Sequence, residues 1–142
     1  MTTIAFPEID YQKQLVLAGL DDFSPNAVLP NVFGGQFGER PDEWRRAAID
    51  FLCINVRVGF LECVNRKEIL GEVGGLVLRD FLVFGDKENN LDVELIWNIL
   101  YFSSTPKLDR ILELLGLNNW DAINQNINQR FVAILMEVYS EM

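Results

Sequence analysis

The chain has 142 residues, of which 49% are hydrophobic, including ten Phe and three Trp. This is the length of a single domain with enough apolar material for a core, which excludes an intrinsically disordered chain. The net charge of −9, from 21 acidic and 12 basic residues, argues against direct nucleic-acid binding, because domains that bind DNA or RNA are usually basic.

The chain also lacks the features that direct proteins to or through membranes. It contains no run of roughly 18 apolar residues, so no membrane-spanning helix is predicted. The first residues lack the basic and apolar regions of a signal peptide. We therefore expect one soluble, cytoplasmic domain over residues 1–142, without a linker or an internal repeat.

The first predicted helix covers residues 7–18. Proline at its start, the acidic Glu8 and Asp10 in its first turn and Gly19 beyond its end are typical boundary signals. Residues 21–40 follow with two prolines and three glycines, and we expect an irregular loop there. Its phenylalanines are expected to pin the loop onto the core, although such long connections are often functional.

Residues 41–64 are predicted to form the central helix, which starts at Pro41 and carries apolar residues at helical spacing. Both cysteines, Cys53 and Cys63, fall within it. Ten residues of helix separate Cα atoms by about 15 Å, whereas a disulfide requires a separation below about 7 Å. We therefore expect two free, buried thiols, as in a reducing cytoplasm.

The segment 68–84 is also predicted to be helical, although three glycines each lower its helix propensity by about 1 kcal/mol. The glycines are interpreted as a site of close helix packing: Gly71, Gly74 and Gly75. One face is predicted to be apolar: Ile69, Leu70, Val73, Val77, Phe81 and Phe84. A minor β-hairpin within 76–102 is the alternative, with strands at 76–84 and 91–102. The adjacent pair Arg79-Asp80 interrupts the alternation that a strand requires, which favours the helix.

Further helices are predicted after this segment. Asn90 is expected to cap a helix that contains Trp97. Thr105 and Pro106 start the next helix, which ends at Gly116.

The last predicted helix begins near Asn118, because Asn118 followed by Asp121 resembles a capping box. It then continues toward the C-terminus with apolar residues at spacings of three and four. Together the segments predict an all-α fold, a compact bundle of about five or six helices.

No motif for catalysis, metal binding or cofactor binding is recognisable. The chain contains no histidine, which removes the commonest general base and the usual zinc ligand. The cysteines lack C-x-x-C spacing, and the glycine-rich segment 32–38 matches neither phosphate-binding fingerprint. The acidic segment from Asp86 lacks Gly and Glu at the sixth and twelfth positions of a calcium loop. We therefore predict no cofactor and no metal.

By elimination, the sequence predicts a non-catalytic binding protein. A small, acidic, helical domain fits an immunity protein or antitoxin-like inhibitor, which occludes the cationic active site of a toxin or nuclease. Its partner is then a basic protein. The residues expected to bind the partner are crowded acids and the asparagines of the last predicted helix: Asp86, Glu88, Asp92, Glu94, Asn124 and Asn128. Reversing Asp86 and Glu88 to Lys is expected to leave the fold intact.

Two other classes of function stay open. An adaptor or structural subunit would bury an aromatic surface in a stable assembly, with Phe33, Phe37 and Trp97 as anchors. A small enzyme would use a pair of carboxylates, as glycosidases do, in a cleft lined with acids of perturbed pKa. The sequence indicates no oligomeric state.

Overall fold

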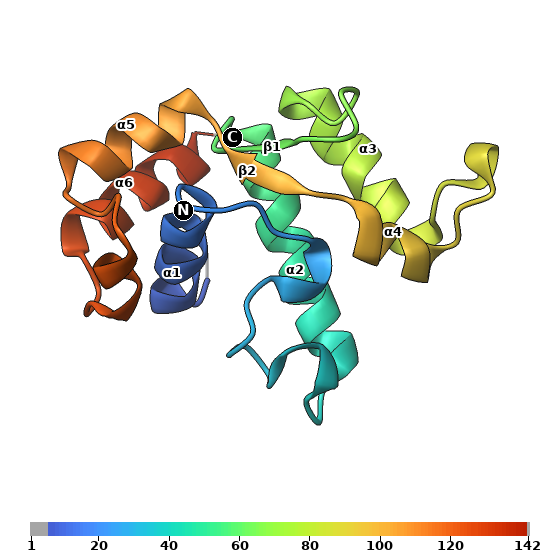
Figure 1. The fold of residues 1–142 in the computed structure, drawn as a ribbon, viewed down its shortest axis with the longest axis horizontal. Coiled ribbons are helices and arrows are strands. Elements are labelled where there is room, and N and C mark those ends of the chain that lie inside the picture. Colours follow the sequence, from blue (N-terminus) through green and yellow to red (C-terminus); the bar gives the residue numbers. More distant parts are fainter. Residues whose placement is uncertain (1–5, 142) are drawn as a thin grey trace.

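The computed structural model describes residues 6–141, which form six α-helices and one antiparallel pair of short strands (Figure 1). The helices are α1 (Glu8–Ala18), α2 (Pro41–Arg57), α3 (Gly71–Phe84), α4 (Val93–Ile99), α5 (Pro106–Leu114) and α6 (Gln129–Ser140). The strands are β1 (Leu61–Cys63) and β2 (Phe102–Ser104). The predicted helical bundle with a minor β element is confirmed.

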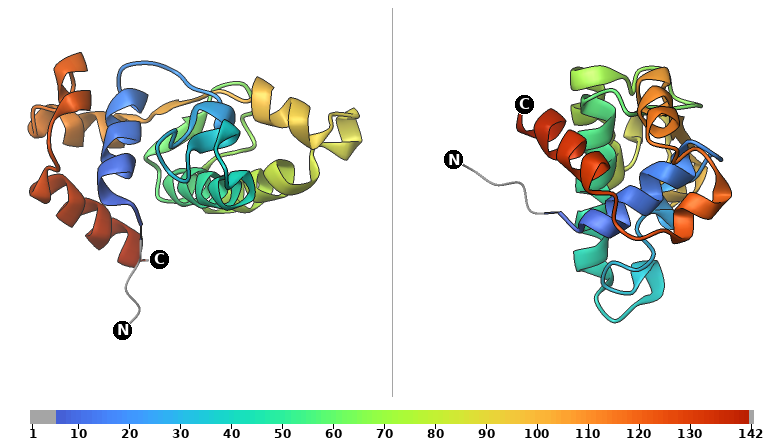
Figure 2. Two further views of the ribbon diagram at one scale, coloured as in Figure 1. Left: turned by 90° about the horizontal axis from the view of Figure 1, so that it is seen from below. Right: turned by 90° about the vertical axis from the view of Figure 1, so that its left-hand side faces the viewer.

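Helix α2 lies at the centre of the molecule, between α3 and α4 on one side and α1, α5 and α6 on the other (Figure 1 and Figure 2). It starts at Pro41 and has two acidic residues in its first turn, both of which suit a helix N-terminus. Its buried face includes Trp44, Phe51 and Leu52, none more than 2% exposed. The indole N–H of Trp44 donates to the carbonyl oxygen of Val28 at 2.8 Å, so its burial leaves no donor unpaired.

The predicted continuous helix over 41–64 is wrong, because α2 ends at Arg57. Gly59 follows with φ of +83°. Its N–H donates to the carbonyl of Val56, and the N–H of Phe60 donates to the carbonyl of Asn55. These two bonds are the Schellman pattern, which satisfies the last carbonyl groups of a helix. The chain therefore turns and enters β1.

The two cysteines consequently lie on different elements, Cys53 on α2 and Cys63 on β1. Both thiols are buried and free, as predicted. The prediction was correct about the thiols but wrong about the geometry that keeps them apart.

The irregular loop over 21–40 is confirmed, with two short 3-10 turns at Pro25–Ala27 and Gly35–Phe37. Phe23 holds its first part, since its backbone exchanges two hydrogen bonds with Phe102 of β2. Phe23 is 4% exposed, but Phe33 and Phe37 are 42% and 90% exposed. Only the first of the three phenylalanines therefore pins the loop to the core.

Residues 71–84 are helical, and the alternative hairpin within 76–102 is not formed. A turn that is closed by paired backbone bonds between Asp86 and Leu91 separates α3 from α4. Asp92, not Asn90, caps α4, because its carboxylate accepts the N–H of Leu95 at 2.9 Å. Asn90 instead occupies the left-handed region, with φ of +58°.

The C-terminal part is divided differently from the prediction. α5 starts after Thr105 and stops before Gly116, as predicted. The capping signal near Asn118 opens only a 3-10 turn, Trp120–Asn124, which Asn119 caps. An extended connection follows, and α6 begins at Gln129 with Asn128 as its cap. Within residues 6–141, no helix combines the length and apolar composition needed to cross a bilayer.

Candidate functional site

The most distinctive surface of the described molecule is the outer face of α3. Three large apolar residues along the helix are exposed: Val73 is 71% exposed, Leu76 69% and Phe84 63%. Leu70, immediately before the helix, is 64% exposed, and Val83 is 45% exposed. Single exposed apolar residues are ordinary, whereas several on one helix face indicate an interaction surface. We call Leu70, Val73, Leu76, Asp80, Val83 and Phe84 the α3 face.

The α3 face is exposed because the opposite side of the helix, with a close contact at Gly75, packs toward the core. Gly74 and Gly75 are buried together with Leu78 and Leu82. A Cβ on Gly75 would lie 3.2 Å from the carbonyl oxygen of Cys53, so a larger residue would separate the helices. The predicted close helix packing is thus confirmed at Gly75 only: Gly74 lies against the backbone of Ile69, which precedes the same helix, and Gly71 has no neighbour within 4 Å of a Cβ position. The predicted apolar face is nevertheless only partly buried.

Charge on the α3 face is acidic at its centre. Asp80 lies between Leu76 and Phe84 on the helix surface and takes part in no ion pair or hydrogen bond among the described residues. Asp80 also lines a surface hollow of about 590 Å³, together with Phe81, Phe84, three other acidic side chains and the basic Arg66 and Lys87. The surface therefore combines apolar contact area with an excess of negative charge, of which Asp80 is an unpaired part.

The four acids predicted to form a binding patch are not equivalent. Asp86 is only 4% exposed, so the prediction that it is a free surface carboxylate is wrong. Its Oδ2 accepts from Arg66 Nη1 at 2.9 Å and from Asn89 Nδ2 at 2.8 Å. The Asn89 hydrogen bond, followed by Arg66, lowers the pKa of Asp86. Asp86 therefore stabilises the turn between α3 and α4.

The other three acids differ in their surroundings. Asp92 caps α4, as described above. Glu94 accepts from Arg45 Nη2 at 3.2 Å, and the guanidinium of Arg45 lies 4.5 Å from the ring centre of Trp97. Glu88 is exposed and forms no ion pair within the described chain. Of the four, Glu88 alone remains an exposed carboxylate without such a role.

The predicted asparagine-rich face of the last helix is not formed. Asn124 is exposed at the end of the 3-10 turn, and Asn128 lies at the start of α6, where its side chain accepts the N–H of Phe131 at 3.0 Å. Gln12 of α1, which is fully buried, donates to the carbonyl of Asn126 at 3.1 Å and accepts the N–H of Asn128 at 2.7 Å. The segment is therefore held by α1.

The three predicted aromatic anchors also separate. Trp97 is fully buried, and its indole N–H donates to the carbonyl of Leu82 at 2.9 Å, so it is a core residue and not an anchor. Phe37 is almost fully exposed, while Phe33 lies under the guanidinium of Arg40 at 4.9 Å. Both belong to the loop over 21–40.

Sequence reasoning missed the α3 face because the helix is apolar around most of its circumference, and apolar spacing alone predicts that the large residues face the core. The glycine pair was the signal that could have found it. Small residues mark the face that packs closely, and the large apolar residues opposite them are left exposed.

Acidic side chains and possible metal ligands are the groups to consider for the alternative of an enzyme. The carboxylates with shifted pKa values are Glu68 and Asp86, and hydrogen bonds lower both, from Arg66 to Glu68 and chiefly from Asn89 to Asp86. A general acid requires the opposite shift. Within residues 6–141, no three His, Cys, Asp or Glu side chains are placed to hold a metal ion. Comparison of the chain with protein-family models, curated proteins and solved structures found no significant match.

Proposed function

We propose that the protein is a non-catalytic binding protein whose α3 face receives a basic protein partner. The exposed apolar surface of α3 is the observation that carries the proposal. Val73, Leu76 and Phe84 are each more than 60% exposed. Burial of such side chains against a partner contributes about 25 cal/mol per Å² of apolar area removed from water.

Asp80 defines the charge of the partner. A carboxylate buried in an interface without a counter-charge is strongly unfavourable. Because Asp80 has no cation of its own among the described residues, a partner that covers the α3 face has to supply one. The same requirement disfavours a symmetric homodimer across this face, where two copies of Asp80 would approach each other.

The rest of the molecule adds to this charge preference. Six of the 21 carboxylates and five of the 12 basic side chains take part in ion pairs, which leaves 15 acidic and seven basic side chains. An excess of this kind steers a cationic protein toward the surface and raises the association rate. A toxin or nuclease with a cationic active site has the required properties. An immunity- or antitoxin-like inhibitor is therefore our preferred class, and the two free thiols support a cytoplasmic location.

The test compares two α3-face variants with two matched controls on α5. Val73→Lys places a charge on the apolar surface, and Leu114→Lys is its control, because Leu114 is 73% exposed. Asp80→Lys reverses the central charge, and Glu113→Lys is its control on another helix. A partner captured from cells of the source organism by the wild-type chain is purified, and its binding kinetics are measured with all four variants.

We expect Val73→Lys to weaken binding at least about tenfold, as for a residue at the centre of an interface. Asp80→Lys should lower the association rate most strongly at low ionic strength. Both controls should bind within about twofold of the wild type. Unchanged affinity of Val73→Lys, or equal losses in the α5 controls, would show that the α3 face does not bind the partner.

The same apolar surface also supports an adaptor or permanent subunit as the second candidate function. Salt dependence distinguishes the two. If the protein inhibits a cationic target, electrostatic steering speeds their association, and the association becomes slower as salt rises. Assembly through apolar contact does not slow in this way. Sedimentation of the purified wild-type chain tests whether a second copy of the chain covers the α3 face. A dimer that Val73→Lys dissociates would show that the face binds another copy and not a basic partner.

A further inference from the structure

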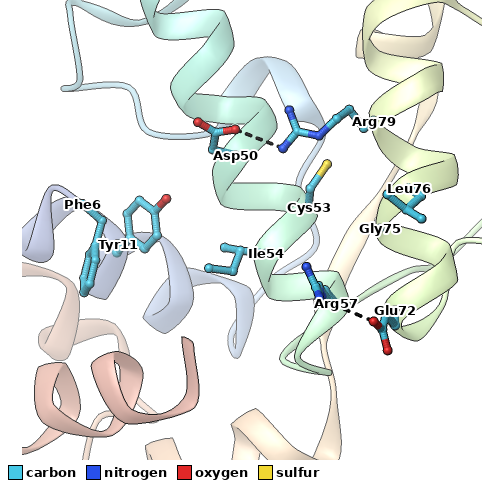
Figure 3. Close-up of a pocket in the computed structure, with 10 residues that line it drawn as sticks. All are labelled: Phe6, Tyr11, Asp50, Cys53, Ile54, Arg57, Glu72, Gly75, Leu76 and Arg79. Carbon is cyan, nitrogen blue, oxygen red and sulfur yellow. Dashed lines mark hydrogen bonds and ion pairs between the residues drawn. The ribbon is translucent and has the colours of Figure 1, made fainter. Parts of the chain in front are cut away.

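A second candidate site lies on the α1 side of the α2–α3 pair. It is a pocket of about 480 Å³ (Figure 3), within the size range of small-molecule sites. Three segments line it: Phe6 and Tyr11 at the N-terminal end, then four residues of α2 and four of α3. The α2 and α3 residues are Asp50, Cys53, Ile54, Arg57, Glu72, Gly75, Leu76 and Arg79.

The hydroxyl group of Tyr11, which opens into the pocket, is the feature that points to a ligand. Tyr11 is 6% exposed, and its ring is fixed between Phe6 and Phe51, with ring centres 4.9 and 4.8 Å away. Its hydroxyl group forms no hydrogen bond with any described residue and points toward α2 across the pocket (Figure 3).

Tyr139 provides the comparison inside the same molecule. It is 1% exposed, and its hydroxyl group donates to Asn55 Oδ1 at 2.6 Å. The hydroxyl of Tyr11 has no such partner among the described residues and stays accessible from the pocket, where a ligand can accept from it. Burial, with a contribution from Asp50, raises the pKa of Tyr11, so the unpaired hydroxyl stays a neutral donor at physiological pH.

Two guanidinium groups add further donors at the pocket. Arg79 Nη2 lies 3.0 Å from Asp50 Oδ1, and Arg57 Nη2 lies 3.4 Å from Glu72 Oε1 (Figure 3). In each pair the arginine is the less exposed partner: 48% against 65% for Arg79 and Asp50, and 44% against 76% for Arg57 and Glu72. Each arginine has five N–H donors, of which the ion pair occupies one.

We propose that this pocket binds a small amphipathic carboxylate. The hydroxyl of Tyr11 and the guanidinium of Arg79 donate to the ligand carboxylate, and Phe6, Ile54 and Leu76 contact its apolar body. The carboxylates of Asp50 and Glu72 are already paired with Arg79 and Arg57, whereas the hydroxyl of Tyr11 has no partner among the described residues, so a ligand with an acceptor head group fits it. The two ion pairs are exposed, and such pairs contribute only about 0–1 kcal/mol each, so Arg79 is free to share its remaining donors with a ligand.

The affinity is expected to be modest. The four charged side chains of the pocket sum to zero, and the net charge of −9 opposes an anion. For a probe of about a dozen non-hydrogen atoms, a Kd of roughly 0.1–1 mM is reasonable. The proposal does not depend on the α3 face: it shares Leu76 with that surface, but Val73 and Asp80 are not among the residues that line the pocket.

The test uses 4-phenylbutyrate as the probe and its neutral amide as the matched ligand, with calorimetric titration of the full chain. We expect the amide to bind at least about tenfold more weakly, since it lacks the charge that makes hydrogen bonds to guanidinium strong. Tyr11→Phe should weaken the carboxylate about three- to tenfold and leave the fold intact, because the lost hydroxyl has no partner. Arg79→Gln should weaken it at least about tenfold. Tyr101→Phe and Arg110→Gln, exposed residues outside the pocket, are the controls.

Protection of Cys53 from chemical modification shows where the probe binds. Cys53 lines the pocket and is 7% exposed, whereas Cys63 of β1 is equally buried, at 6%, outside it. Saturating 4-phenylbutyrate should slow modification of Cys53 by the small reagent methyl methanethiosulfonate at least about threefold and leave Cys63 unchanged. Any one of four results would overturn the proposal: equal binding of the amide, unchanged affinity of Tyr11→Phe, equal protection of both thiols, or no binding at 10 mM probe.

Discussion

Single side chains in the turn between α3 and α4 show how one buried contact changes the role of an acidic residue. Asp86 looks like part of an acidic surface in the sequence, yet it shares one oxygen between Arg66 and Asn89. Arg66 in turn lies 4.6 Å from the ring centre of Phe81 and pairs with Glu68. Arg66 therefore links the segment before α3 to the turn after it, and Asp86 is the buried end of that link.

We expect Asp86→Asn to lower the midpoint of thermal unfolding at pH 7, because the substitution removes the charge that Arg66 binds. The pKa of Asp86 is lowered in the folded state, so its contribution is fully present above the ordinary carboxyl pKa, near 4. It is lost as pH falls through the lower folded pKa. The difference in midpoint between wild type and variant should therefore shrink below about pH 4. Thermal unfolding followed by circular dichroism between pH 7 and pH 2 measures it.

Glu88→Gln is the matched control, because Glu88 lies in the same turn, is exposed and has no ion-pair partner among the described residues. Its unfolding midpoint should follow the wild type at every pH. A difference for Asp86→Asn that stays constant down to pH 2 would show that the contact depends on shape and not on charge.

At the level of elements, two helices end in the same way, and both ends can be tested together. In α5, as in α2, a glycine of positive φ follows the helix: Gly116 has φ of +70° and Gly59 has +83°. We expect Gly59→Ala and Gly116→Ala each to lower the free energy of unfolding by about 1 kcal/mol, since alanine resists the left-handed region. Urea unfolding of the purified variants measures this.

Asparagine variants at the same positions separate conformation from packing. Asn adopts the left-handed region more readily than Ala, so Gly116→Asn should lose less stability than Gly116→Ala. A Cβ at Gly116 meets nothing within 4 Å, which removes steric clash as an explanation there. Equal losses for Ala and Asn would argue against a conformational cause.

The two helix ends also show what local sequence can and cannot predict. Gly116 was recognised as a stop because the apolar pattern ends with it. Gly59 carries the same signal, but apolar residues continue beyond it, and the pattern was extended through the turn. The apolar residues after Gly59, such as Phe60 and Leu61, are buried because they begin a strand region, not because a helix continues.

The start of α6 depends on a contact that local sequence does not contain. Gln12 reaches the backbone of Asn126 and Asn128 from more than a hundred positions away in the chain. This contact holds the connection extended, so the helix cannot begin at the earlier capping signal near Asn118. Helix existence was predictable from spacing, whereas this boundary was set by tertiary structure.

For the whole molecule, composition leads to the prediction of a basic partner but contains no information about where that partner would bind. Net charge is a sum over all residues, so it contains no information about position. Three of the four predicted acids have structural contacts, while Asp80, the acid on the apolar surface, was noted only as an interruption of strand alternation. The candidate surface depends on which side of α3 meets α2, and the close contact at Gly75 marks that side.

The excess of negative charge also predicts how the stability of the whole chain responds to salt. Salt weakens favourable ion pairs and unfavourable repulsion alike. Four of the six ion pairs are on the surface and contribute about 0–1 kcal/mol each. The two pairs of Arg66, a side chain that is 19% exposed, are screened less. Because 15 acidic side chains but only seven basic ones are unpaired, we expect salt to weaken repulsion more than attraction and so to stabilise the folded state.

We therefore expect the thermal midpoint at pH 7 to rise by a few degrees between 10 and 150 mM NaCl, which corresponds to about 1 kcal/mol for a chain of this length. Glu113→Gln with Glu137→Gln, which neutralises two exposed acids outside the ion pairs, should raise the midpoint at low salt and reduce its salt dependence. Arg110→Gln adds to the negative excess and should do the reverse. A midpoint that falls with salt in all three proteins would mean that the ion pairs outweigh the repulsion. Screening lowers stability only when the interactions that it weakens are favourable on balance.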